Sequence, residues 1–228
     1  MCGRYVQGKS PGDLERFLKP DLCSPDLPGP SWNIKPTEQI SVLVTDQRQG
    51  GRRLHPAQWA LTPPWSPTLR TKSPLFNARI ESVLETPSFR DSVKDRRCII
   101  PACGCYEWTG EPGKRTPHYI SSEQPLLFAG LTSWWHDPSA PRDSGWHLTA
   151  TILTTDSYGP IERIHHRLPV FMTDDLVDDW LSPSLHADEG LLDVVSERSL
   201  SVGVTLREHE VAPLRGDGPH LIEPAVIV

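Results

Sequence analysis

The second residue of the chain is a cysteine, within the segment Cys2-Gly3-Arg4. A small residue after Met1 favours removal of the methionine, and we expect that removal to leave Cys2 as the amino terminus. Its amine and thiol would then form a 1,2-aminothiol, which condenses with an aldehyde to an imine and closes to a thiazolidine. An α-amine has a pKa of about 7.7–8.0, so much of it is unprotonated at neutral pH. The alternative is that Cys2 is an ordinary small apolar residue.

Two internal segments add polar groups that could act beside such an amine. Asn77 and Arg79, close to Glu81, could orient a polar substrate or clamp a phosphate. Glu107 lies between two aromatic residues, where desolvation would raise the pKa of its carboxyl into the range of a general acid. The alternatives are a turn asparagine with solvated neighbours and a glutamate on the wet face of a strand.

The segment His165-His166-Arg167 places two imidazoles and a guanidinium before a proline. A histidine can shuttle protons near neutral pH. Adjacent residues of a strand point to opposite faces, so we expect at most one of these histidines to enter a site. The alternative is one packed histidine and one solvated histidine.

Length and composition bound the class of protein. The chain has 228 residues, enough for one domain with a full core or for two small ones, and no run approaches the ~20 apolar residues of a membrane span. The start of the chain lacks the apolar stretch of a signal peptide. The cysteine count is odd, which does not suggest a disulfide framework, and the spacing of Cys98, Cys103 and Cys105 does not fit zinc. We therefore expect a reducing cytosol and no metal or other cofactor.

Periodicity and turn residues predict many short elements. We expect helices over 10–20, 86–94, 173–181 and 185–196, and strands over 40–45, 57–61, 98–101, 105–108, 118–121, 126–131, 148–154 and 202–206. Turns are expected at 49–52 and within a polar loop over 138–145. Strands do not alternate with helices, so the prediction is one α+β domain over 1–228, with a mainly antiparallel, barrel-like sheet and a few flanking helices.

Several segments together resemble the SRAP family, the SOS-response-associated peptidase-like proteins. They occur in the family's order and approximate spacing: Cys2-Gly3-Arg4, 32–37, 76–81, 101–108 and 165–169, with support from 58–65 and 216–224. The resemblance covers nearly the whole chain. Cys103 and Cys105 depart from the family pattern, which is often non-cysteine there, so a second thiol is expected near the site.

The resemblance implies a DNA-repair function, the sensing of abasic sites. The residue matching Cys2 would form a thiazolidine crosslink with the ring-opened abasic sugar. Asn77 would position the Cys2 amine and the sugar, and Glu107 would assist proton transfer during imine formation. His165 would protonate the sugar ring oxygen. An abasic site is an aldehyde in equilibrium with a closed sugar, so this chemistry agrees with that of the aminothiol.

The resemblance also implies a partner, single-stranded DNA that contains abasic sites. Arg4, Arg79 and Arg167 would bind phosphates around the lesion, and Trp65 with Trp59 would stack on neighbouring bases. We expect a monomer without membrane attachment, cytoplasmic and, in a bacterium, associated with the nucleoid.

Two other functions remain open at this point. A cysteine peptidase acting through Cys2, limited to releasing Met1 or not, is the first. A module that binds single-stranded DNA without covalent chemistry is the second. The sequence does not say whether strand cleavage of the AP-lyase type accompanies an imine.

Overall fold

The structure is a computed structural model that describes residues 2–46, 50–111 and 113–225. Met1 and Gln49, which enter two of the sequence predictions, lie outside this range. The strands are β1 Arg4–Gln7, β2 Leu22–Cys23, β3 Ser31–Ile34, β4 Gln39–Thr45, β5 Arg52–Trp59, β6 Asn77–Arg79, β7 Arg97–Thr109, β8 Thr116–His136, β9 Trp146–Asp156, β10 Arg167–Pro169 and β11 Arg207–Glu210.

The helices are few and short. The α-helices are α1 Pro11–Leu18, α2 Arg90–Asp95, α3 Val177–Leu181 and α4 Glu189–Gly203, and the 3-10 turns are η1 Ile80–Ser82, η2 Gly159–Ile161, η3 Asp174–Leu176 and η4 Pro219–Ile222. None of the helices in the described part of the chain is long and apolar enough to cross a lipid bilayer.

One mixed sheet organises the molecule. Its strands follow the order β11-β8-β9-β5-β4-β7-β1-β3, and β7 also pairs with β8. The ladder through β8, β9, β5, β4 and β7 therefore returns to its starting strand. The α+β class and the predominance of antiparallel pairs are confirmed, although β5 and β6 both run parallel to β9 and β2 runs parallel to β5.

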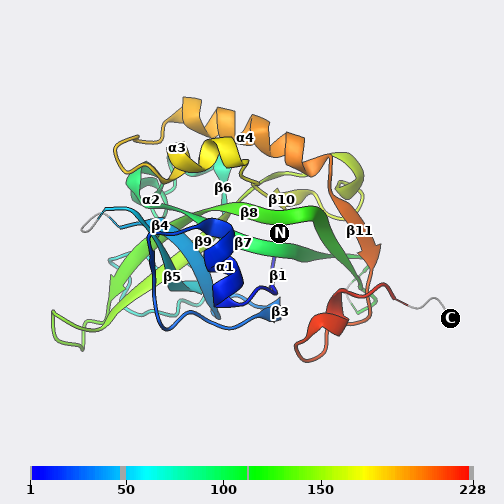
Figure 1. Ribbon diagram of the computed structural model, residues 1–228, viewed down its shortest axis with the longest axis horizontal. Helices are drawn as coiled ribbons and strands as arrows, with labels where there is room; N and C mark the ends of the chain where they lie inside the picture. The colour runs from blue at the N-terminus through cyan, green and yellow to red at the C-terminus, as the bar shows by residue number, and fades with distance from the viewer. Residues whose placement is uncertain (1, 47–49, 112, 226–228) are drawn as a thin grey trace.

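Two apolar clusters hold the layers together. One lies within the sheet and contains Tyr5, Trp59 and Phe128, whose rings meet edge to face. The other lies between the sheet and α2, α3 and α4. Figure 1 shows α3 and α4 side by side along one side of the sheet, so the other side is left to the amino-terminal segments.

Local capping explains the helix that the sequence predicts best. The Ser10 hydroxyl caps the backbone of Asp13, whose carboxylate accepts from the Ser10 amide, so α1 begins at Pro11 as expected. The helix expected from residue 86 begins later, at Arg90, after a turn. The helices expected near 173–181 and 185–196 are present as η3 with α3 and as α4.

The strand boundaries differ from the predicted ones more than the helix boundaries do. The segments 98–101 and 105–108 join into β7 across an irregularity between Ala102 and Gly104, and 118–121 joins 126–131 in β8. The strand expected over 202–206 is wrong, because Val202 and Gly203 end α4. Gly203 has no side chain, which leaves room for the ring of Tyr158 against the last residue of the helix.

Candidate active site

Cys2 lies immediately before β1, and its side chain is fully buried. β1 pairs antiparallel with β7, and Tyr5 stands opposite Cys105. This register directs Cys2 toward the part of β7 that carries Glu107. The Cys2 carbonyl accepts a hydrogen bond from Asn77 Nδ2 at 2.9 Å. Strand pairing and one side-chain amide thus fix the start of the chain.

Asn77 is held by its own strand and by a buried ring. It is the first residue of β6, where it pairs with Ile152 of β9. The carbonyl of Phe76 accepts from Trp59 Nε1 at 2.9 Å, and Trp59 is fully buried with its ring 5.1 Å from that of Tyr5. Trp59 therefore holds the backbone next to Asn77 from inside the core. Neither face of its buried ring is open to a base.

Glu107 is a buried carboxyl in the middle of the sheet. Only 2% of its surface is exposed. Burial disfavours the charged form and raises the pKa of Glu107 to about 7. Near neutral pH the carboxyl is then present in both forms, and it can give a proton and take one back.

His165 lies in the turn that leads into β10. His165 Nδ1 lies 3.0 Å from the backbone amide of Arg167 and 3.1 Å from the carbonyl oxygen of the same residue, so the Arg167 backbone fixes the orientation of the ring. Burial lowers the pKa of His165 to about 4. At neutral pH this imidazole is therefore uncharged.

The two histidines do not point to opposite faces as expected. They precede β10 rather than lying within it, and their rings stack with centroids 4.4 Å apart. The alternation rule applies only to extended strands, which is why it failed here. His166 is exposed, and His165 is half-buried.

Arg167 turns its charge inward. Its guanidinium makes two 2.9 Å contacts with the carboxylate of Glu81 and one of 2.5 Å with Asp156, and it donates to the Thr154 carbonyl at 2.6 Å. The side chain is 3% exposed. In this arrangement Arg167 ties the segment after Asn77 to the segment after His165, and its guanidinium faces carboxylates rather than solvent.

Three other predicted residues lie nearer the surface. Arg4 is half-buried and donates to Asn33 Oδ1 at 2.7 Å. Arg79 is exposed on β6. Trp65 is 60% exposed in the loop after β5. A flat ring and two guanidinium groups are thus at least partly open to solvent, on the loop after β5 and on β1 and β6.

The sequence did not predict a chain of hydrogen bonds that begins at His118, the residue paired with Glu107. His118, opposite Glu107 in the β7–β8 ladder, contacts Thr109 Oγ1 through Nε2 at 2.8 Å and Glu208 through Nδ1 at 2.9 Å. Glu208 also pairs with Arg163. The residues come from distant parts of the sequence, so no local pattern could have found the chain. It links β11 and the segment before His165 to the strand that carries Glu107.

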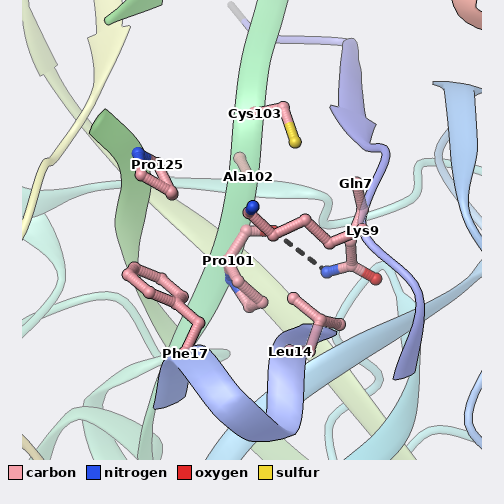
Figure 2. Close-up of a pocket in the computed structure, with 8 residues that line it drawn as sticks. All are labelled: Gln7, Lys9, Leu14, Phe17, Pro101, Ala102, Cys103 and Pro125. Atoms are coloured by element: carbon pink, nitrogen blue, oxygen red, sulfur yellow. Dashed lines mark hydrogen bonds between the residues drawn. The ribbon is translucent and has the colours of Figure 1, made fainter. Parts of the chain in front are cut away.

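The irregularity in β7 separates the two nearby cysteines. Cys105 joins the cluster that contains Cys2, whereas Cys103 packs in a separate cluster. Figure 2 shows Cys103 at a hollow between β7 and α1, beside Lys9. The hollow holds about 10 Å³, room for one water at most. Within the described ranges, no three His, Cys, Asp or Glu side chains are grouped to hold a metal ion.

Comparisons with known proteins bear on the whole chain. The family model described as "SOS response associated peptidase (SRAP)" matches residues 1–212. The abasic site processing protein YoqW of Bacillus subtilis is 34% identical over 187 residues, which cover 80% of this chain and 81% of YoqW. The abasic site processing protein YedK of Escherichia coli is 26% identical, with 83% of each chain covered.

A solved structure supports the fold. The crystal structure of a protein from Bacteroides thetaiotaomicron superposes with a TM-score of 0.79, covering 99% of this chain and all of that one. The two sequences are 19% identical. At this identity the likeness speaks for the architecture alone.

The buried carboxyl makes a direct prediction. We expect Glu107 to titrate with a midpoint near pH 7 by ¹³C NMR, because burial raises its pKa from 4.5 to about 7. The unfolded chain loses this proton at lower pH than the folded chain, so the free energy of unfolding falls as pH rises from 4.5 to 7, by about 3 kcal/mol from this group. Glu107→Gln should lack that decrease. A wild-type midpoint near 4.5 would contradict the assignment.

Proposed function

Since the chain belongs to the SOS response associated peptidase (SRAP) family, we propose that it processes abasic sites in DNA and that Cys2 is the residue that reacts. The relatives named above are called abasic site processing proteins. The observation that carries the proposal is the convergence of Cys2, Asn77 and Glu107 from three strands or strand ends. The proposal requires that Met1 be removed, since only then does Cys2 carry a free amine.

The first step is imine formation. The Cys2 amine adds to the aldehyde carbon of the ring-opened sugar and gives a carbinolamine, which loses water to become an imine. Departure of water needs a proton on the leaving oxygen, and a carboxyl with a pKa of about 7 can supply it. The Asn77 amide, by holding the Cys2 carbonyl, limits the directions in which the amine can point.

The second step is closure. The Cys2 thiol adds to the imine carbon, a C–S bond forms, and the thiol proton passes to the nitrogen. The product is a five-membered thiazolidine, and water is the only molecule released over the two steps. Because the thiol is already buried beside the amine's own carbon, closure needs no second molecule. Strand cleavage by β-elimination from the imine, an AP-lyase outcome, would compete with this closure.

His165 is proposed to help open the sugar. Its lowered pKa makes a freely charged imidazolium unsuitable as the acid at neutral pH. In the tautomer that carries its proton on Nε2, the neutral ring can instead donate a hydrogen bond to the sugar ring oxygen. Arg167 then acts indirectly, because its backbone fixes the orientation of the His165 ring and its side chain ties this segment to Glu81.

We propose single-stranded DNA as the preferred substrate, bound by a monomer. The exposed Trp65 offers a ring for base stacking, and Arg4 and Arg79 offer phosphate contacts. Residues 1–120, which contain these three, carry 17 Lys+Arg against 12 Asp+Glu, whereas residues 121–228 carry 6 against 17. The basic half of the sequence is thus the half proposed to face DNA.

Replacement of Cys2 tests the nucleophile. We expect the protein with Met1 removed to form a heat-stable adduct with an abasic single-stranded oligonucleotide, and Cys2→Ala to form none, because the thiol that traps the imine is gone. An amine remains, so borohydride should still trap an imine. Intact-mass spectrometry reads both, with Cys98→Ala as the buried-thiol control.

Undiminished stable adduct in Cys2→Ala would rule out Cys2 as the crosslinking residue. Peptide cleavage without an adduct would favour a peptidase. Reversible binding without an adduct would favour a non-covalent module.

The proton-transfer residues should affect rate more than binding. Glu107→Gln and His165→Ala should each slow crosslinking by about 10²–10⁴-fold while DNA affinity stays near wild type. His166→Ala, a change at the exposed neighbour of His165, is the matched control. Crosslinking rates and anisotropy titrations measure the two quantities. Rates within about twofold of wild type for both variants would contradict the proton-transfer roles.

Substrate form provides a third test. Initial crosslinking should be much faster on single-stranded than on duplex abasic DNA, because a duplex must be bent or partly melted at a cost of a few kcal/mol. Affinity should fall as salt rises. Trp65→Ala should weaken single-strand binding by about 1–3 kcal/mol, whereas Trp146→Ala, at another exposed tryptophan, should not. Equal rates on both DNA forms would remove the single-strand preference.

A further inference from the structure

The three arginines predicted to bind phosphate are held in different ways. Arg4 Nη1 donates to Asn33 Oδ1 at 2.7 Å, so its partner is a neutral amide. Arg167 is paired with carboxylates, and Arg79 is exposed on β6. In the part of the chain that the structure describes, none of the ion pairs involves Arg4. Arg4 is therefore fixed in position while its positive charge remains available to an anion.

The direction of the Asn33 amide is set by a segment far away in the sequence. Asn33 lies on β3 with 5% of its surface exposed, and its Nδ2 donates to the Gly216 carbonyl at 2.7 Å. A carbonyl can only accept, so the amide nitrogen must face Gly216 and the amide oxygen must face Arg4. The side chain of Asn33 thus links the guanidinium to the carboxy-terminal part of the chain.

That part of the chain, residues 214–222, forms a clasp over β3. Asp217 Oδ1 accepts from the backbone amide of Trp32 at 2.6 Å, and Leu214 and Ile222 pack with Trp32 in one apolar cluster. Gly216 has a φ of +74°, in the left-handed region that favours glycine, and it turns the clasp toward β3. Figure 1 shows the segment after β11 returning to the side of β3.

Arg4 lies beside the residue proposed to react. The Cys2 thiol donates to the Arg4 carbonyl at 3.7 Å. Across the sheet, Arg4 stands opposite Tyr106, the neighbour of Glu107 on β7. An anion bound by Arg4 would therefore lie close to the start of the chain. In DNA, the anions next to an abasic sugar are its own two flanking phosphates.

We propose that Asn33 is a positioning residue which, together with the clasp, directs the Arg4 guanidinium at a phosphate flanking the abasic sugar. This role rests on the proposed function, since it names the group that Arg4 binds and what holds Arg4 in place. A free arginine side chain loses rotamer freedom when it binds an anion, and a side chain fixed beforehand loses less. Asn33 therefore supports affinity for DNA, whereas the chemistry at Cys2 does not depend on it.

A double-mutant cycle tests whether Asn33 acts through Arg4. Full-length protein with Met1 removed is titrated with a single-stranded oligonucleotide that carries tetrahydrofuran at the abasic position, so that no aldehyde is present and binding is measured alone. Arg4→Gln should weaken binding about tenfold and reduce the slope of log affinity against log salt by about 0.7. Asn33→Ala should weaken binding about threefold to tenfold in wild type, reduce the slope as well, and have no effect in Arg4→Gln.

Two further variants separate positioning from damage to the strand. Ser31→Ala, the matched control, removes a hydroxyl that accepts from the Asn33 backbone amide at 3.3 Å, and it should bind like wild type. Asp217→Ala removes an exposed carboxylate of the clasp and should weaken binding in wild type but not in Arg4→Gln. If Asn33→Ala does not fold, Asp217→Ala takes its place in the cycle.

Crosslinking to true abasic DNA gives the second readout. In Asn33→Ala the rate at saturating DNA should stay near wild type, while the DNA concentration for half the maximal rate rises. A merely structural role would lower the saturating rate as well.

Wild-type affinity in Asn33→Ala would overturn the proposal. Equal losses from Asn33→Ala with and without Arg4 would also overturn it, as would unchanged affinity in Arg4→Gln. A protein that shows the coupling between Asn33 and Arg4 but makes no adduct with abasic DNA would uphold the positioning role and overturn the proposed function.

Discussion

The pairing of β1 with β7 is the interaction on which the site depends. It places Tyr5 opposite Cys105 and so brings the start of the chain beside the most buried carboxyl of the sheet, Glu107. The same ladder continues from β7 to β8 and β4, so β7 cannot shift without disturbing the core. An amino-terminal residue, usually among the less ordered parts of a domain, is thereby held within a folded scaffold.

Burial then divides the chemical roles. It raises the pKa of Glu107 to about 7 and lowers the pKa of His165 to about 4, so the carboxyl exchanges protons near neutrality while the imidazole stays uncharged. These opposite shifts have one cause, since removal from water penalises each charged form. The buried guanidinium of Arg167 keeps its charge because it pairs with the carboxylates of Glu81 and Asp156. These ion pairs join the segment after Asn77 to the segment after His165.

Short sequence motifs predicted the features that depend on residues close together in the chain. The cap of α1 and the choice of Cys2, Asn77 and Glu107 as neighbours rest on residue types in short motifs and on resemblance. Long-range packing decided the rest. Trp59 looked available for bases but is buried beneath Asn77. Helix α4 extends to Gly203 and takes the first two residues of the strand expected at 202–206, and the missing side chain of Gly203 leaves room for the ring of Tyr158.

The central claim is that Cys2 closes a thiazolidine on the abasic sugar. The most direct measurement is a ¹³C NMR spectrum of the adduct made with an oligonucleotide labelled at the aldehyde carbon of its abasic site. We expect a tetrahedral carbon with the chemical shift of a carbon bonded to both nitrogen and sulfur, and we expect this signal to be absent in Cys2→Ser. A labelled carbon that stays a trigonal imine, or returns to the closed sugar when the protein is denatured, would contradict the account.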